Sequence, residues 1–355
     1  SGRLWGSNVL SGATAVGTYR VDVIDDSQWT NATSSLDRYY IQSHGVAGNG
    51  ARQTVFLRSM IRSFSSYMHA SHDENDVNFG TGDVIDGPVY VNDQIHINGS
   101  PRFLQDVSSA ASSVDYNNGA NSSVFEGGLS LNVVPLSLEQ QFASNYVTDV
   151  KSEAEGGGAG ISLTGNYRLN FTSAGNLTYV SVTGGTPVTR SLSTINGAIY
   201  VNGDAYVNGV LNGKVTVAAQ DAIYISNSIT YASAVSPNPW STNFNVAAVD
   251  DMLGLIARNQ VQILGSNSVT IHAAVMVTSD GGGFNADLYD KRIGKPNINL
   301  FGSLTQYRRG AVGQATNPWR GFAKNYKFDA RFAGDSPPFF PYSVYVFDRW
   351  RQASY

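Results

Sequence analysis

Short apolar segments alternate with glycine, asparagine and serine along most of the chain. Between about Asp83 and Gly302 these segments have the length and the polar–apolar alternation that are typical of β-strands. Gly and Asn tolerate the positive φ angles of tight turns, so the residues between the segments indicate frequent turns. The pattern therefore predicts a mainly β chain built from many short strands.

A six-residue repeat organises the middle of this region. Three units follow one another from Ile195, with the sequences INGAIY, VNGDAY and VNGVLN, and each opens on an apolar residue followed by Asn-Gly. A turn every six residues, with apolar residues in matched places, favours a β-solenoid whose short strands stack coil upon coil. Hairpins closed by type I′ Asn-Gly turns are the alternative, although their strands would be only about four residues long.

An earlier segment repeats this pattern. Residues Gly87–Gly99, GPVYVNDQIHING, align without gaps on Gly197–Gly209, GAIYVNGDAYVNG. Stacked coils bury apolar faces that no single coil covers. We therefore predict a β-solenoid domain at residues 83–302.

One helix is predicted, at about 137–155. Its start is indicated by a capping box at Ser137–Gln140, where a serine is followed three residues later by glutamine. Apolar residues then recur every four positions over Leu138–Val150, and three glycines at Gly156–Gly158 end the pattern. We expect this helix to pack against the side or the end of the solenoid.

The two ends of the chain predict a separate, smaller sheet. Thr18–Asp25 alternates like a half-buried strand, and Arg38–Ser63 forms two strand-like segments around a Gly-rich loop. So small a sheet needs a further element for stability, and the alternating aromatic segment Tyr342–Trp350 can supply it. We predict one antiparallel sheet domain made from residues 1–82 and a C-terminal segment, 303–355, that returns to it, with the solenoid inserted between them.

Composition narrows the classes of function. The chain has no cysteine, which excludes disulfides, thiolate metal sites and cysteine nucleophiles. Charged residues make up 14% and glycine 37 of 355 residues, which argues against long helices, while 42% hydrophobic residues can form a packed core. No stretch approaches the roughly 18 apolar residues that a membrane helix needs.

Charge is unevenly distributed along the chain. Residues 1–280 carry 12 Lys and Arg against 22 Asp and Glu, whereas residues 281–355 carry 11 against 5. Aromatic residues lie among these late cations, a mixture that nucleic-acid grooves use, and rings such as Trp319 and Tyr326 would stack on exposed bases. A sheet with solvated cations and inward-facing aromatics is the alternative, since strand alternation alone produces it. We predict phosphate contacts from Lys291, Arg292, Lys295, Arg308, Arg309, Arg320, Lys324 and Lys327.

Signals of catalysis are weak. The acidic pairs Asp25-Asp26 and Asp250-Asp251 consist of adjacent residues, whose side chains point to opposite faces of a strand, so neither pair is a ready acid–base couple. Phosphate-binding and nucleophile motifs are also lacking. We therefore predict a protein without catalytic residues and without a cofactor.

One cluster of possible metal ligands lies between the early hairpin and the solenoid. Its members are His69, His72, Asp73, Glu74 and Asp76. A polar loop explains them as well as a zinc or calcium site does, so we predict no metal. His96 and His272 lie within strand patterns and are expected to be packed or surface residues.

Several segments resemble a known family of bacterial envelope proteins, the PilX-type minor pilins of type IV pili. The hairpin at Arg38–Ser63 is similar to the early part of the pilin sheet. The resemblance implies a β-solenoid inserted in a small pilin-like antiparallel sheet, with one or two short helices. The similar segments of the later chain are, in order, Asp251–Leu264, Thr270–Val277, Gly302–Gly313 and Asp335–Pro341.

The resemblance also implies a function. It suggests an extracellular pilus subunit of the cell envelope that contacts other pilin subunits and, in competence systems, binds DNA for natural transformation. Pilins begin with a hydrophobic membrane helix, whereas this sequence begins Ser1-Gly2-Arg3, so we expect a truncated soluble form. A structural or adhesive subunit that contacts surfaces or glycans is the alternative. A polysaccharide-cleaving β-helix enzyme is a further one, and no small-molecule substrate is expected.

Overall fold

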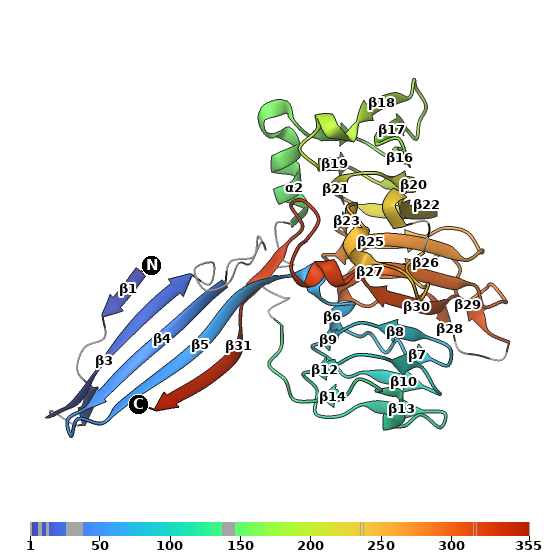
Figure 1. Ribbon diagram of the computed structural model, residues 1–355. Coiled ribbons are helices and arrows are strands. Elements are labelled where there is room, and N and C mark those ends of the chain that lie inside the picture. The colour runs from blue at the N-terminus through green and yellow to red at the C-terminus, as the bar shows by residue number, and fades with distance from the viewer. Residues whose placement is uncertain are drawn as a thin grey trace. The chain divides into compact units, whose positions relative to one another are not determined.

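The structure is a computed structural model that describes most of the chain (Figure 1). The described residues are mainly β, as the sequence predicts, and include a single α-helix. They form two compact units, one made of Ser1–Ser63 with Tyr342–Tyr355 and the other of Phe64–Pro341. The ranges described are 2–5, 9–11, 14–25, 38–136, 146–234, 236, 238–314, 316 and 318–354.

The smaller unit is an antiparallel sheet with the strand order β1-β3-β4-β5-β31, in which β2 also pairs with β3. The C-terminal strand lies against β5, with Tyr342 opposite Ser63 and Ser354 opposite Gln53. Strands from both ends of the chain therefore share one sheet. Their bounds are β1 (Gly2–Trp5), β2 (Val9–Ser11), β3 (Thr14–Asp25), β4 (Arg38–Ala47), β5 (Arg52–Ser63) and β31 (Tyr342–Ser354).

The larger unit is built on a long parallel row of strands, which we call the first row (Figure 1). Successive members pair in parallel, for example Ile161 with Ile199 and Ile199 with Val217. Its order and bounds are β15 (Ile161–Thr164), β19 (Ala198–Asn202), β21 (Lys214–Ala219), β23 (Met252–Ala257), β25 (Val269–Val277), β27 (Asn297–Arg308), β6 (His69–Asp73), β9 (Val89–Val91), β12 (Val107–Ser109) and β14 (Leu129–Ser130).

Two further parallel rows accompany the first. The second row is β16 (Tyr167–Thr172), β20 (Ala205–Leu211), β22 (Ala222–Tyr231), β24 (Gln260–Ile263) and β26 (Gly283–Ala286). The third row continues from the first half of β27 through β30 (Ala323–Phe328), β8 (Val84–Asp86) and β11 (Arg102–Phe103). A further, short parallel row is β7 (Phe79–Gly80), β10 (His96–Asn98) and β13 (Asp115–Asn117), and the remaining strands are β17 (Asn176–Ser181), β18 (Val188–Ser191), β28 (Gly313–Gln314) and β29 (Arg320–Gly321).

The six-residue units do not pair with one another. Ile199 pairs with Val217, and Ala205 pairs with Ile223, in each case 18 residues further along the chain. Three units therefore separate one strand from its parallel partner. The glycines of the three units all have positive φ, as the Asn-Gly pattern predicts: Gly197, Gly203 and Gly209. The β-solenoid itself stays a prediction.

The helix α2 (Tyr146–Glu155) covers the outward face of the first row at the end formed by β15, β19 and β21. Its buried residues Val147, Val150 and Ala154 pack in a cluster with residues of β19, β21, β23 and β25. Because both faces of these strands are covered, β23 is buried at every position. Among the described residues no helix has the length and apolar character needed to cross a membrane.

The helix ends at Glu155, as predicted, and the three glycines that follow form a 3-10 turn. The predicted capping box and residues 137–145 lie outside the described residues. Short 3-10 segments connect other elements: η2 (Phe64–Ser66), η3 (Ser122–Val124), η4 (Gly156–Gly158), η5 (Leu192–Thr194), η6 (Ala232–Ala234), η7 (Val246–Ala248) and η8 (Ala330–Ala333).

The order of strands in space differs from their order in the chain (Figure 1). β6, from the start of the larger unit, pairs with β27, where His69 lies opposite Leu304. β8 likewise pairs with β30, where Val84 lies opposite Asn325. We call the two strand pairs β6–β27 and β8–β30 the seam. From β6 at the seam, the chain adds strands in one direction as far as β14, at one end of the first row. It is described again from α2 and β15, at the opposite end of the row, and then adds strands toward the seam until it reaches β27 and β30.

The unit boundaries differ from the predicted ones at 82 and 303. Residues 64–82 and 303–341 belong to the larger unit, because β6 and β30 take part in its parallel rows. Sequence alternation indicates that these segments are strands, but it does not show whether their partners are antiparallel or parallel.

Candidate functional site

Two adjoining pockets open at the seam of the larger unit. The first, the seam pocket, has a volume of about 430 Å³ and is lined by residues between Asn75 and Asp83 on one side and between Tyr289 and Lys324 on the other. The second, the side pocket, has a volume of about 390 Å³ and adds residues of β24 and β26. Both pockets include Asn75, Tyr289 and Ala311, and we call them together the groove.

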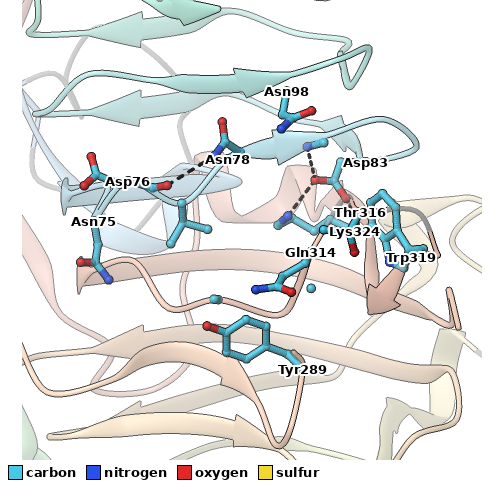
Figure 2. Close-up of a pocket in the computed structure, with 14 residues that line it drawn as sticks. Asn75, Asp76, Asn78, Asp83, Asn98, Tyr289, Gln314, Thr316, Trp319 and Lys324 are labelled. Atoms are coloured by element: carbon cyan, nitrogen blue, oxygen red, sulfur yellow. Dashed lines mark hydrogen bonds and ion pairs between the residues drawn. The ribbon is translucent and has the colours of Figure 1, made fainter. Parts of the chain in front are cut away.

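Amide and hydroxyl side chains supply much of the polar lining of the groove (Figure 2). In the seam pocket they are Asn75, Asn78, Asn98, Gln314 and Thr316. In the side pocket they are Gln260, Gln262 and Asn285. Each amide carries a donor and an acceptor, and can therefore pair with a hydroxyl group in either direction. The lining suits a ligand that is rich in hydroxyls.

A tight turn at one wall of the groove is fixed across the seam. Asn75 and Asp76 have φ angles of 50° and 53°, a conformation that Asn and Asp tolerate better than most residues. The backbone N–H of Asn75 donates to Oδ1 of Asp73 at 2.7 Å, and its Nδ2 donates to the carbonyl of Arg309 at 3.4 Å. The turn is thereby tied to the chain on the opposite side of the seam.

Two aromatic rings, Tyr289 and Trp319, also line the seam pocket (Figure 2). Nε1 of Trp319 donates to the carbonyl of Gly321 at 3.2 Å, which fixes the edge of the indole. The ammonium of Lys295 lies 4.4 Å from the centre of the indole ring and donates to the carbonyl of Thr81 at 3.1 Å. Lys295 therefore holds the Trp319 ring in place through a cation–π contact.

The chain segment that carries Tyr289 is a turn that hydrogen bonds and an ion pair hold in place. Leu288 has a φ of 52°, which is unusual for a leucine and marks a tightly constrained backbone. The guanidinium of Arg320 donates to the carbonyls of Asp290 and Lys291 at 3.2 and 3.4 Å. Lys291 also pairs with Asp290 at 2.7 Å. These bonds position Tyr289 before any ligand arrives.

The floor of the seam pocket contains a buried ion pair (Figure 2). Nζ of Lys324 donates to Oδ2 of Asp83 at 2.7 Å, and the backbone N–H of Lys324 donates to Oδ1 at 2.8 Å. Gly80 donates a further backbone hydrogen bond to Oδ2. Burial lowers the pKa of Lys324, an effect that the Asp83 carboxylate opposes. The pair joins β30 to the turn before β8 and so spans the seam.

A second buried ion pair lies behind this pocket. The guanidinium of Arg309 donates to Glu74 and lies 3.6 Å from the centre of the Phe79 ring. Glu74 also accepts hydrogen bonds from Nε2 of His69 at 3.0 Å and from the hydroxyl of Ser71. Burial opposes the ionisation of Glu74, but Arg309 and His69 outweigh it and lower its pKa to about 2.

Two of the eight predicted phosphate contacts are not on the surface. Arg309 is 2% exposed and Lys324 6% exposed, and each is compensated by a carboxylate inside the seam. The predicted ring contact at Tyr326 fails for the same reason, because that side chain is 2% exposed. These three residues stabilise the junction between strands and do not present charge or ring faces to a polymer.

The other six predicted cations lie at or near the surface. Arg308 lines the side pocket and pairs with Asp73 at 3.2 Å. Arg292 pairs with Asp287 at 3.3 Å, and Lys327 is half-buried on β30. The structure brings four of the six together around the turn that carries Tyr289: Lys291, Arg292, Lys295 and Arg320. Their contact with phosphates stays a prediction.

The candidate metal ligands of the sequence have separate partners. His69 and Glu74 bond to each other inside the seam, whereas the His72 ring lies against the Tyr307 ring, tilted by 31° and with 4.8 Å between centres. In the described part of the chain, no group of three or more His, Asp or Glu residues gathers in a way that would hold a metal ion. The cluster in the sequence is therefore divided between the core and the surface.

The two strand histidines differ in their surroundings. His272 is 2% exposed, and its Nδ1 accepts a hydrogen bond from the backbone of Tyr231 at 3.0 Å. Burial lowers the pKa of His272 to about 3, so the ring is neutral. His96 is partly exposed and bonds to Asp115 at 3.0 Å.

Most of the groove residues escape detection in the sequence. Trp319 stands out as an aromatic residue within the basic segment, but Asn75, Asn98 and Gln314 resemble ordinary turn residues. Their convergence depends on the seam, which joins segments more than 200 residues apart, as the 235-residue separation of Glu74 and Arg309 shows. No protein-family model, no curated protein and no solved structure matches this chain, so the resemblance to minor pilins stays a prediction.

Proposed function

We propose that the larger unit binds an uncharged glycan of the cell surface or its surroundings. The observation that carries this proposal is the lining of the groove, where amide side chains surround two fixed aromatic rings. Amides pair with sugar hydroxyls in both directions, and the apolar faces of sugar rings pack on aromatic side chains. A concave site with a few oriented polar groups is the usual form of a binding pocket.

The electrostatics of the groove favour a neutral ligand over an anionic one. Lys324 at the floor is neutralised by Asp83, and Arg308 in the side pocket is paired with Asp73. Asp76 adds negative charge to the lining, and Asp290 is paired with Lys291. A polyanion would have to displace these carboxylates, whereas a neutral sugar leaves the internal pairs intact.

The hydrogen bonds of Asp83, the buried carboxylate of the seam pocket, favour binding of a glycan over its cleavage. Both oxygens of Asp83 accept hydrogen bonds, from Lys324 and from the backbone of Gly80. A carboxylate whose two oxygens are engaged by a cation and two backbone donors is not placed to act on a glycosidic oxygen. The proposed role is therefore that of an adhesive, non-enzymatic subunit.

We further propose that the protein is a minor-pilin-like subunit of the cell envelope. Strands from both chain ends share one antiparallel sheet, which supports a minor-pilin-like subunit with the larger unit inserted. Parallel partners 18 residues apart support the further proposal that the inserted unit is a β-solenoid. Such a subunit would display its groove outside the cell and contact other pilin subunits through its sheet.

Substitution of the groove rings tests the proposal. A panel of neutral oligosaccharides is titrated against the protein by calorimetry, and we expect at least one to bind. Trp319→Ala and Tyr289→Ala should each weaken that binding about tenfold or more, because each removes a preformed aromatic contact. Tyr116→Ala is the control, since Tyr116 is exposed on β13 and lies outside the groove lining.

DNA is the second candidate ligand, and exposed Lys291 and Arg308 near the groove favour it. It is tested in the same titration with duplex and single-stranded DNA at increasing salt. Affinity for DNA that falls steeply with salt and is lost in Arg308→Glu, without binding to any neutral sugar, would replace the glycan proposal. Equal sugar binding by Trp319→Ala and the unmodified protein would also contradict it.

A further inference from the structure

The outward face of the second row continues the groove. On β20, β22, β24 and β26 the register places four outward side chains directly beside one another: Tyr206, Tyr224, Gln262 and Asn285. Their strand neighbours Val207, Ile225 and Ile263 are fully buried, so these four point away from the core. We call them the outer ladder. Gln262 and Asn285 also line the side pocket, which makes ladder and groove continuous.

The outer ladder is held rigid by contacts between neighbouring strands. The rings of Tyr206 and Tyr224 stack with 4.7 Å between centres and 22° between planes. Beside them, Nδ2 of Asn285 donates to Oε1 of Gln260 at 3.1 Å. Side chains that are already fixed lose little conformational entropy when a ligand binds.

Each rung of the outer ladder offers a hydrogen-bonding group. Tyrosine contributes a hydroxyl, and glutamine and asparagine contribute amides. The pKa of Tyr224 is raised, mainly by burial and also by the charges of Asp204 and Asp221. Its phenol therefore keeps its proton at physiological pH. The same two carboxylates add negative charge beside Tyr224, while Arg168 of β16 lies next to Tyr206 at the end of the ladder.

The spacing of the rungs is set by the spacing of the strands. Neighbouring parallel strands lie about 4.8 Å apart, which is close to the advance per residue of an extended, β-linked chain of six-membered sugar rings. A polysaccharide that runs along the row therefore meets one rung per sugar. A chain of different pitch would lose this match after one or two rungs.

From this register and continuity we infer that the outer ladder binds an extended neutral polysaccharide, one sugar per strand, and that this chain ends in or passes through the groove. The inference rests on the proposed function and specifies its ligand as a polymer that occupies all four rungs, two of which, Tyr206 and Tyr224, lie beyond the pockets. The groove supplies the aromatic contacts, and the outer ladder sets the direction of the chain.

A chain-length series tests the inference. Oligomers of β-1,4-linked glucose and of β-1,4-linked N-acetylglucosamine, from dimer to hexamer, are titrated against the full protein. We expect the affinity of one series to rise at least tenfold from dimer to hexamer. In the double variant Tyr206→Phe, Tyr224→Phe, which keeps the stacked rings, the hexamer should lose about tenfold in affinity while the dimer is unaffected. Tyr116→Phe serves as the control.

The possible results separate the two proposals. If dimer and hexamer bind equally, and binding still depends on Trp319, the groove binds sugar and the outer ladder does not. If the double variant binds the hexamer as tightly as the unmodified protein, the inference also fails. If neither series binds at any length, the outer-ladder inference fails for both polymers. If, in addition, no sugar of the wider panel binds, the glycan proposal fails with it.

Discussion

Glu74 and Arg309 form an ion pair inside the seam, where both side chains are almost completely buried and His69 and Ser71 also bond to Glu74. Buried pairs of this kind add little to net stability, but removal of one partner leaves an uncompensated charge. Here the partners come from opposite sides of the seam. Their role is to define which strands meet, because a shifted register would leave both charges unpaired.

The substitution Glu74→Gln tests this role. It should reduce the free energy of unfolding by roughly 3 kcal/mol, because Arg309 then stays buried without a counter-charge. Glu126→Gln is the control, since Glu126 forms an exposed pair with Arg102, and it should leave the chemical denaturation midpoint unchanged. Equal effects of the two substitutions would contradict the assignment.

Glu74 also makes stability depend on pH. Its pKa is about 2 in the folded chain and 4.5 in an unfolded one, so the unfolded state binds more protons between these values. The stabilisation is complete above pH 4.5 and is lost as the pH falls toward 2. Urea denaturation across this range should show a slope that Glu74→Gln reduces, and an unchanged slope in the variant would argue against the low pKa.

At the scale of elements, alternation locates the strands but not their partners. β24 alternates and has one open face, whereas β23 is apolar throughout, and its second face packs in the cluster that contains α2 and Phe340. These patterns are visible in the sequence, as are the positive φ angles of the Asn-Gly units. The seam is not visible, because nothing local to β6 or β27 specifies a partner so distant in the chain. The burial of Arg309 and Lys324 follows from the seam and was missed with it.

Gly302 marks a corner within a single long strand. The first half of β27 pairs with β30, and the second half pairs with β6, so the strand passes from one row to another at this residue. Gly302 has a φ of 153°, and a Cβ there would lie 1.9 Å from the carbonyl oxygen of Ala273. Such a contact can be relieved only if the backbone moves.

We expect Gly302→Ala to destabilise the larger unit strongly, with a lower thermal unfolding temperature by circular dichroism, because it forces strands β25 and β27 apart. Gly156→Ala is the matched control: a Cβ at Gly156 meets nothing within 4 Å, and its φ is not positive. Similar unfolding temperatures for the two variants would show that the corner at Gly302 is not constrained.

At the scale of the whole molecule, the larger unit has the properties of an insertion. The chain enters it at Phe64 and leaves it at Pro341, and the backbone N–H of Phe64 donates to the carbonyl of Pro341 at 3.1 Å. Entry and exit are therefore adjacent, as in domains that tolerate transfer between hosts.

Excision of the larger unit tests this property. Residues 64–341 expressed alone should fold, with strand-type circular dichroism and the same sugar binding as the full chain. Residues 83–302, the boundaries that the sequence suggested, should fail to fold because they lack β6 and β30 and thus both strand pairs of the seam. Folding of the shorter fragment would show that the seam is dispensable.

The seam also affects how such a protein can change during evolution. The outer margins of the parallel rows, near β14 and near β15, lie far along the chain from the residues that form the seam pocket. Gain or loss of one 18-residue interval, like the one between Ala205 and Ile223, at the β16 end of the second row would alter the number of rungs without disturbing that pocket. Relatives of this chain could therefore differ in the length of polymer they hold while they keep one invariant anchoring point.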